Sequence, residues 1–221
     1  MRHYSRLRRL YTIDYTGDNN IDKSDNNKNY IEQSVHSMNP TNLIEKIIRE
    51  RVLECRYYKE MCFGLTVINR YIAATICDRA VRLKCIGGQY LNQRPTEFLC
   101  LAFKLLQLQP EKEIVLEYLY ARDFKYLQAL AAFYIRLTFP AKECYIILEP
   151  FLSDYRKLRI RYSTGSYGLT YIDEFIDHLL NEERVCDIAL PRLPTRFILE
   201  EMDELEPRKS AMEDELENEE N

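Results

Sequence analysis

The chain has 221 residues, 46% of them hydrophobic and 30% charged, which is the composition of a globular protein with a sizeable core. Its net charge of −4 is unevenly spread, because residues 1–34 carry +1, residues 35–199 carry +4 and residues 200–221 carry −9. No apolar run reaches the ~18 residues of a membrane-spanning helix, the N-terminus lacks a signal-peptide core, and the seven cysteines include no C-x-x-C pair. We therefore expect neither a membrane protein nor a zinc ribbon, but a cytosolic or nuclear protein with reduced cysteines.

Three parts are predicted along the chain. Residues 1–34 are expected to be disordered, because MRHYSRLRRL is basic and DNNIDKSDNNKN has almost nothing to bury. The basic decamer has two interpretations: it is an RNA contact or nuclear address, or it is a solvated extension. Residues 35–206 are expected to form one helical domain, and residues 207–221 an acidic tail.

Helical periodicity, together with cap and breaker residues, predicts the first half of the domain. Asn39–Pro40 and Thr66 are helix-start signals, and Gly87–Gly88 and Pro110 are helix-stop signals. The apolar stripe of the first helix consists of Leu43, Ile44, Ile47, Ile48, Val52 and Cys55. The predicted helical ranges are 39–55, 66–84, 95–109 and 111–120, and residues 56–63 are predicted to be a short turn or a second helical piece. The segment GGQYLNQRP is predicted to be a loop, and it lacks the G-K-S/T of a phosphate-binding loop.

The segment DFKYLQALAAFYIRLT, residues 123–138, is apolar on nearly every side and is predicted to be a buried central helix. Its first residue is the expected N-cap, and Pro140 stops it. Only Lys125, Gln128 and Arg136 interrupt its apolar surface. The predicted fold class is therefore mainly α: a single compact multi-helix domain around this helix, with a small β-hairpin and flexible charged tails.

The C-terminal part of the domain changes character twice. Residues 141–158 are predicted to be helical with a break at Glu149–Pro150, whereas residues 159–170, RIRYSTGSYGLT, alternate around Thr-Gly-Ser and predict a β-hairpin. Thr170 is the expected cap of the next helix, YIDEFIDHLLN. Residues 186–199, with two prolines, are expected to form an extended or irregular strap packed on the body.

The most polar cluster lies on that last helix. Glu174 and His178 are four positions apart and share a face, as metal ligands or an acid–base pair would. The other histidines, His3 and His36, lie near the N-terminus, so a solvated charged face is the favoured interpretation. The sequence has no G-x-S-x-G, Walker or dinucleotide motif. We expect no catalytic residue, no metal and no cofactor.

A basic run flanked by tyrosines occupies residues 155–162. Arg156, Lys157, Arg159 and Arg161 are basic, Leu158 and Ile160 lie between the last three of them, and Tyr155 and Tyr162 flank the run. Arginines beside tyrosines form a plausible edge for phosphate contact and base stacking. A solvated face or a protein-binding face is an equally ordinary interpretation, because tyrosine is frequent at protein interfaces.

Five long stretches of the chain carry a resemblance to a known family. The first three are NPTNLIEKIIRERVLECRYYKEMCFGLT, GGQYLNQRPTEFLCLAFKLLQLQPEKEIVLEYL and DFKYLQALAAFYIRLT. The other two are YIILEPFLSDYRKLR and YIDEFIDHLLNEERVCDIALPRLPTRFILEE. These stretches resemble the pre-mRNA-splicing factor 38 family, and the similarity covers residues 35–207 in all. The N-terminal extension through residue 34 lies outside the family pattern.

The resemblance implies a helical, non-enzymatic nuclear scaffold that acts in spliceosome activation as a tri-snRNP-associated monomer within a large complex. It also implies partners: a helical protein of the microfibrillar-associated type, a zinc-finger splicing protein and a small nuclear ribonucleoprotein. The alternative is a direct RNA-binding module that uses the basic run, with Arg159 and Arg161 as candidate contacts.

Two polar segments inside the family-like blocks are the candidate partner-binding sites. They lie at a loop and at a helix end, where polar residues either bind a partner or tie the loop to the body by hydrogen bonds. The candidates are Tyr90, Asn92, Gln93, Arg94, Asp154, Tyr155, Arg156 and Lys157.

Overall fold

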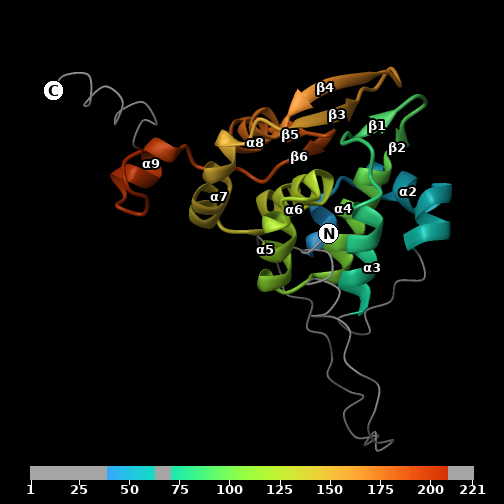
Figure 1. Ribbon diagram of the computed structural model, residues 1–221, viewed down its shortest axis with the longest axis horizontal. Helices are drawn as coiled ribbons and strands as arrows, with labels where there is room; N and C mark the ends of the chain where they lie inside the picture. Colours follow the sequence, from blue (N-terminus) through green and yellow to red (C-terminus); the bar gives the residue numbers. More distant parts are fainter. Residues whose placement is uncertain (1–38, 63–70, 209–221) are drawn as a thin grey trace, which may run out of the picture.

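A computed structural model of the chain describes residues 39–62 and 71–208, which form a mainly helical domain with three short antiparallel strand pairs (Figure 1). This confirms the predicted fold class. The predictions for residues 1–34, for Thr66 and for the tail beyond residue 208 lie outside the described residues, and the domain boundaries stay a prediction. No helix in the described ranges is long and apolar enough to cross a membrane.

The helix α6 (Lys125–Thr138) lies at the centre, as predicted, and contacts α3, α4, α5, α7 and α8. Its N-cap position is Phe124, not the predicted Asp123. Two of its polar residues, Gln128 and Arg136, are also buried. Arg136 Nε donates to the Leu179 carbonyl at 2.7 Å, and its Nη2 donates to the Pro191 carbonyl at 2.7 Å. The central helix therefore anchors the C-terminal strap through a buried arginine.

The N-terminal elements differ from the single helix predicted over residues 39–55. Asn39 caps a 3₁₀ turn, η1 (Pro40–Leu43), and the chain restarts as α2 (Lys46–Glu54) after an extended Ile44. The π-helix η2 (Tyr58–Cys62) follows, and then α3 (Tyr71–Ala80), which ends before the predicted Lys84. Because the helix restarts, one member of the predicted apolar stripe, Ile47, faces outward.

The predicted loop GGQYLNQRP is a small hairpin. Strands β1 (Gln89–Tyr90) and β2 (Arg94–Pro95) pair across a three-residue turn. Thr96 caps α4 (Glu97–Leu108), and α5 (Lys112–Tyr120) follows, close to the predicted bounds. Strands of two residues leave too short a pattern for periodicity to detect.

The helix predicted over residues 141–158 ends early. The observed elements are α7 (Ala141–Leu148) and the 3₁₀ turn η3 (Glu149–Ser153), so the break falls at the predicted Glu149–Pro150. Leu158 lies instead in the predicted hairpin, which is formed by β3 (Lys157–Arg161) and β4 (Tyr167–Tyr171). The hairpin is longer than predicted at both ends.

The C-terminal strap also contains regular elements. The helix α8 (Ile172–Asn181) has Tyr171, not Thr170, at its N-cap position; the Thr170 hydroxyl donates to Glu174 at 2.7 Å. The short pair β5 (Arg184–Val185) and β6 (Ile188–Ala189) follows, and α9 (Arg196–Glu201) ends the strap. The predicted extended or irregular strap is therefore found up to residue 195, and the structure differs from the prediction in the helix α9.

Candidate partner-binding surface

The β1–β2 and β3–β4 hairpins lie side by side on one edge of the helical body (Figure 1). The Ile86 N–H donates to the Arg159 carbonyl at 2.8 Å, and the Arg161 N–H donates to Ile86 at 2.9 Å. At the tip, the Leu91 N–H donates to the Ser163 carbonyl at 2.9 Å. The predicted partner loop and the predicted basic run, distant in sequence, therefore share one surface.

The turn of the β1–β2 hairpin holds its polar side chains outward. Leu91, Asn92 and Gln93 all have positive φ values of 23°, 51° and 61°, a region that asparagine enters more readily than most residues. Asn92, Gln93 and Arg94 are exposed, and Tyr90 is half-buried. The turn thus presents an amide pair and an arginine to solvent.

Three of these predicted residues, Tyr90, Asn92 and Gln93, line a groove of about 470 Å³ that we call the hairpin groove. Its walls come from α2, from the β1–β2 hairpin and from the β5–β6 turn, with Ser163 at one end. Two exposed apolar side chains lie in it, Ile47 at 60% exposure and Leu91 at 54%. The remaining lining residues are Glu45, Ile48, Arg51, Gln89, Arg184 and Asp187.

Charged contacts hold the walls of the hairpin groove together. Arg184 pairs with Glu45 at 2.7 Å, and Arg51 donates to the Gln89 side chain at 2.7 Å. The Gln89 N–H donates to the Asp187 carboxylate at 2.6 Å. These contacts join three segments that are remote in sequence, and they leave an apolar strip between polar rims.

The arginines of β3 stack on tyrosines. The Arg161 guanidinium lies 3.4 Å from the ring centre of Tyr90 and 5.2 Å from that of Tyr167, and Arg159 lies 5.5 Å from Tyr167. A guanidinium cation that lies over an aromatic ring is attracted by the negative face of that ring. The structure therefore brings Tyr90 and Arg161 together, two residues that the sequence placed in different candidate sites.

Arg156, by contrast, is engaged within the domain. Its Nε donates to Asp154 at 2.8 Å, its Nη1 to the Arg122 carbonyl, and its Nη2 to the buried Gln128 of α6. The hydrogen bonds from Arg156 hold the pKa of the Asp154 carboxyl below its usual value. These contacts fit the second interpretation of the sequence, a tie between the loop and the body.

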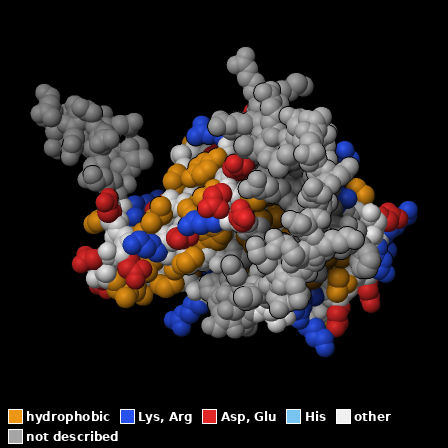
Figure 2. Space-filling model, turned by 90° about the horizontal axis from the view of Figure 1, so that it is seen from below, with side chains coloured by type: hydrophobic (Ala, Val, Ile, Leu, Met, Phe, Trp, Pro, Cys, Tyr) orange, Lys and Arg blue, Asp and Glu red, His pale blue; other side chains and the backbone are white. Residues whose placement is uncertain are grey.

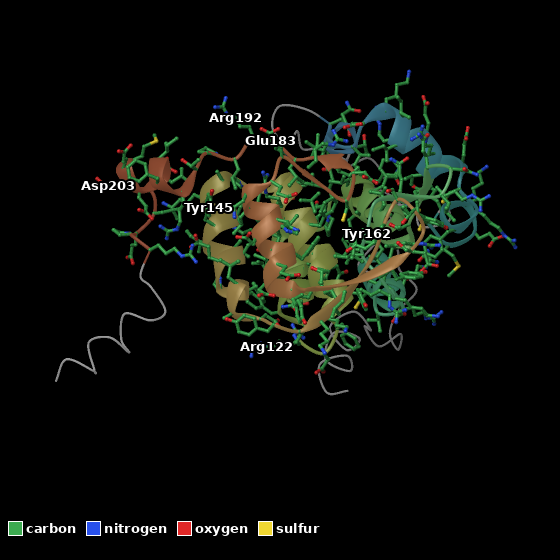
Figure 3. The ribbon with its side chains drawn as sticks, turned by 90° about the horizontal axis from the view of Figure 1, so that it is seen from above. Arg122, Tyr145, Tyr162, Glu183, Arg192 and Asp203 are labelled. Atoms are coloured by element: carbon green, nitrogen blue, oxygen red, sulfur yellow. The ribbon has the colours of Figure 1, made fainter. Side chains whose placement is uncertain are left out.

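Tyr155 points to a different groove. Its side chain is 70% exposed and, with Ile146 and Leu205, it lines a depression of about 970 Å³ between η3 and the segment after α9. We call this the C-terminal groove. Arg196 closes one side through Glu149 at 2.6 Å. The hydroxyl of Tyr145, which is labelled in Figure 3, donates to the Pro194 carbonyl at 3.0 Å. Figure 2 shows hydrophobic side chains among charged ones at this end of the molecule.

Sequence reasoning missed the residues that complete the hairpin groove. Glu45, Arg51, Arg184 and Asp187 carry no local signal, because their role depends on contacts between segments that lie far apart in sequence. The sequence placed Ile47 in the inward apolar stripe of a single helix, and its exposure follows from the restart of the helix at Lys46, which was not predicted.

The polar cluster on α8 has no metal-site geometry. Glu174 accepts hydrogen bonds from Thr170 and Tyr171, and His178 lies 3.9 Å from Glu182 on the surface. Within residues 39–62 and 71–208, no three histidine, cysteine or acidic side chains gather to hold a metal ion.

The fold and the surface together define a class of protein: a compact helical domain that carries the hairpin groove, the C-terminal groove and an arginine–tyrosine edge. The chain belongs to the PRP38 family, whose model matches residues 33–203. It is 52% identical to Pre-mRNA-splicing factor 38A of Xenopus laevis over 186 residues, which are 84% of this chain and 58% of that protein. The chain thus matches little more than half the length of that relative.

Two further comparisons cover more of the other chain. Pre-mRNA-splicing factor 38 of Schizosaccharomyces pombe is 57% identical over 178 residues, which are 80% of this chain and 81% of that one. The crystal structure of the Snu23–Prp38–MFAP1(217–258) complex of Chaetomium thermophilum superposes with a TM-score of 0.74 at 52% identity, over 83% of this chain and 95% of that one. The family resemblance in the sequence is confirmed.

Proposed function

We propose that this chain is a non-enzymatic scaffold in pre-mRNA splicing, which acts in the nucleus and binds other splicing proteins needed for spliceosome activation. The observation that carries the proposal is the extent of the relationship: relatives named as pre-mRNA-splicing factors are 52% and 57% identical over at least 80% of this chain. The hairpin and C-terminal grooves support a binding role, since both combine exposed apolar side chains with charged rims.

The partners proposed are those of the solved relative, an MFAP1-type segment and a Snu23-type zinc-finger protein. A short segment that docks on a folded domain takes most of its affinity from a few apolar anchors in a groove. In the hairpin groove those contacts are offered by Ile47 and Leu91, with Tyr90, Asn92 and Gln93 available for polar contacts. Tyr155 and Ile146 play the corresponding part in the C-terminal groove.

The test replaces one groove residue and one matched residue on the same helix. We expect Ile47→Arg to weaken binding of the MFAP1-type or Snu23-type segment by about tenfold or more, which corresponds to ~1.4 kcal/mol, because a charge replaces an apolar contact. Leu53→Arg is the control, since Leu53 is 42% exposed on α2 but does not line the groove. Isothermal titration calorimetry with each purified segment measures both variants.

Two results would contradict parts of this proposal. If Ile47→Arg and Leu53→Arg bind as the unchanged chain does, the hairpin groove is not the binding site. Tyr155→Ala then reports whether the C-terminal groove is used. If the unchanged chain binds neither segment, and nuclear extract yields no splicing proteins on it, the scaffold function itself is wrong.

A second function, direct RNA binding, has one specific observation in its favour. Arg159 and Arg161 lie on the same edge as Tyr90 and Tyr167, and this is the combination of cation and ring that single-stranded RNA binds. Arg156 contributes little to such a surface, because its three guanidinium nitrogens donate inside the domain. This function requires an affinity that falls steeply with salt.

A further inference from the structure

Two cysteine sulfur atoms lie in contact near the C-terminal end of α2. Cys55 is the first residue after that helix and is half-buried, and Cys100 is a buried residue of α4. Their Sγ atoms are 3.4 Å apart, close enough for one thiol to donate to the other sulfur. The Tyr58 N–H also donates to Cys55 Sγ at 3.3 Å. The pair is 45 positions apart in sequence.

The surroundings make the two thiols unequal. The hydrogen bond from Cys100, the N–H groups of Tyr58 and Tyr57, and the charge of Lys59 lower the pKa of Cys55 to about 6, against the opposing effect of burial. The same hydrogen bond, followed by burial, raises the pKa of Cys100. Burial raises the pKa of the other five thiols, those of Cys62, Cys77, Cys85, Cys144 and Cys186.

A peroxide-sensitive cysteine pair needs an accessible sulfur that reacts first and a second thiol within reach that resolves it. Cys55 meets the first requirement, because it is half-buried and lies outside the helix. Cys100 meets the second, because its sulfur touches that of Cys55. Cys55 has extended backbone (φ −69°, ψ 145°) at the helix end, and a disulfide requires the two sulfur atoms to close from 3.4 Å to a bond of ~2.05 Å.

We propose that Cys55 and Cys100 form a reversible oxidation site, which a peroxide converts to an intramolecular disulfide. The Cys55 thiolate attacks one peroxide oxygen, the O–O bond breaks, and hydroxide leaves to give the Cys55 sulfenic acid. Cys100 sulfur then attacks the Cys55 sulfur; the S–O bond breaks, and the departing hydroxide takes the Cys100 proton as water. Two thiols are oxidised and one peroxide is reduced to two waters, and a dithiol reductant reverses the change.

The disulfide would join two elements that now touch without a covalent bond. It ties the end of α2, which carries one wall of the hairpin groove, to the buried helix α4. In a reducing compartment the resting form is the dithiol. In the oxidised form the closed loop restricts the unfolded chain, so the protein should unfold at a higher temperature.

The first measurement is reactivity in the full-length reduced chain. At pH 7 we expect iodoacetamide to modify Cys55 several-fold faster than Cys85, which is also half-buried but has a raised pKa. The second is peroxide treatment, followed by blocking of free thiols and digestion with trypsin and a glutamate-specific protease. This digestion yields residues 98–104, which separates Cys100 from Cys85. We expect this peptide to be linked to the one that holds Cys55.

Variants separate the site from general oxidation. Cys55→Ser should abolish the cross-link, whereas Cys100→Ser should leave Cys55 trapped as a sulfenic acid or as a glutathione adduct. Cys85→Ser, the matched control, should leave the cross-link and its peroxide dependence unchanged. If Cys55 reacts no faster than Cys85, if peroxide links other pairs equally well, or if the link forms only in urea-unfolded chain, the proposal is wrong.

Discussion

The Arg156 guanidinium donates to Asp154, Arg122 and Gln128, although the sequence places this arginine in a run of surface cations. Spacing alone could not separate it from Arg159 and Arg161, because its acceptors come from a loop and from the central helix. Partner contact at Asp154 and Arg156 stays a prediction. A substitution there alters the fold as well as the surface, so Tyr155, at 70% exposure, is the better probe of binding.

We expect Asp154→Asn to lower the free energy of unfolding by about 1 kcal/mol at neutral pH, because it removes a charge-assisted hydrogen bond that is only partly shielded from solvent. The folded-state pKa of Asp154 is lowered, so its stabilisation is complete above the unfolded-state value of ~3.9 and is lost as pH falls through the folded-state value. Urea titrations at several pH values should show the two proteins converging in acid.

The control for this prediction is Asp177→Asn, an exposed residue of α8 whose carboxylate accepts from Asn181 at the surface. Its effect should stay within ~0.5 kcal/mol at neutral pH. A wild-type chain that loses no more stability in acid than Asp154→Asn would contradict the assigned role of the pair.

At the scale of elements, the sequence predicted what periodicity and caps encode. α4, α5, α6 and α8 lie within a few residues of their predicted ranges, because each has a long apolar stripe. The errors in the predicted elements fall where the contacts of a few residues decide where an element begins or ends. The β1–β2 hairpin has two-residue strands, and the helix predicted to Leu158 ends because β3 needs that residue to pair with Thr170. Tertiary pairing outweighed local propensity there.

Thr96 is the residue where two of these elements meet. Its hydroxyl accepts from the Leu99 N–H at 3.2 Å, which caps α4, and donates to the Gly87 carbonyl at 2.6 Å, which fixes the start of the hairpin. The side chain is buried. We expect Thr96→Ala to cost about 2–3 kcal/mol, because it removes a cap and leaves two buried backbone groups unpaired. Urea unfolding measures the change.

Two comparisons isolate the hydroxyl in this prediction. Thr96→Ser keeps it and should cost less than ~1 kcal/mol. Thr195→Ala removes a threonine from the N-cap position of α9, where the side chain makes no capping bond, and should have little effect. An equal loss for Thr96→Ala and Thr195→Ala would show that the cap at α4 is not a stabilising contact.

At the scale of the whole molecule, the sequence indicated the family, the central helix and most of the helical order, and the comparisons confirm the family. It did not indicate that residues 45–51, 89–93 and 184–187 converge on one groove, because no local pattern records which segments meet. Tyr155 and the loop at residue 90, which belong to the two candidate partner-binding segments of the sequence, lie in different grooves.

The charge distribution of the whole chain bears on its choice of partner. Residues 35–199 carry +4 and residues 200–221 carry −9, so a nucleic acid meets a mildly basic body and a strongly acidic segment in one molecule. A phosphate backbone binds through released counterions, and an acidic segment opposes it. The scaffold function therefore predicts weak RNA affinity for the purified full-length chain, although its arginine–tyrosine edge has the residue types that bind RNA.

Fluorescence anisotropy with a short single-stranded RNA, measured over a range of salt concentrations, distinguishes the two functions. If Arg159 and Arg161 contact phosphates, the double variant Arg159→Gln/Arg161→Gln should reduce the slope of log K against log salt by about 1.4, at ~0.7 per contact for single strands. The control is Lys142→Gln/Arg192→Gln, which removes the same charge from exposed positions outside the β1–β2 and β3–β4 hairpins.

We expect weak binding, and the same small change in RNA affinity for the Arg159/Arg161 variant and for the control variant, because charge alone then sets the affinity. A loss confined to the Arg159/Arg161 pair, with thermal unfolding unchanged, would contradict this and favour the RNA-binding function.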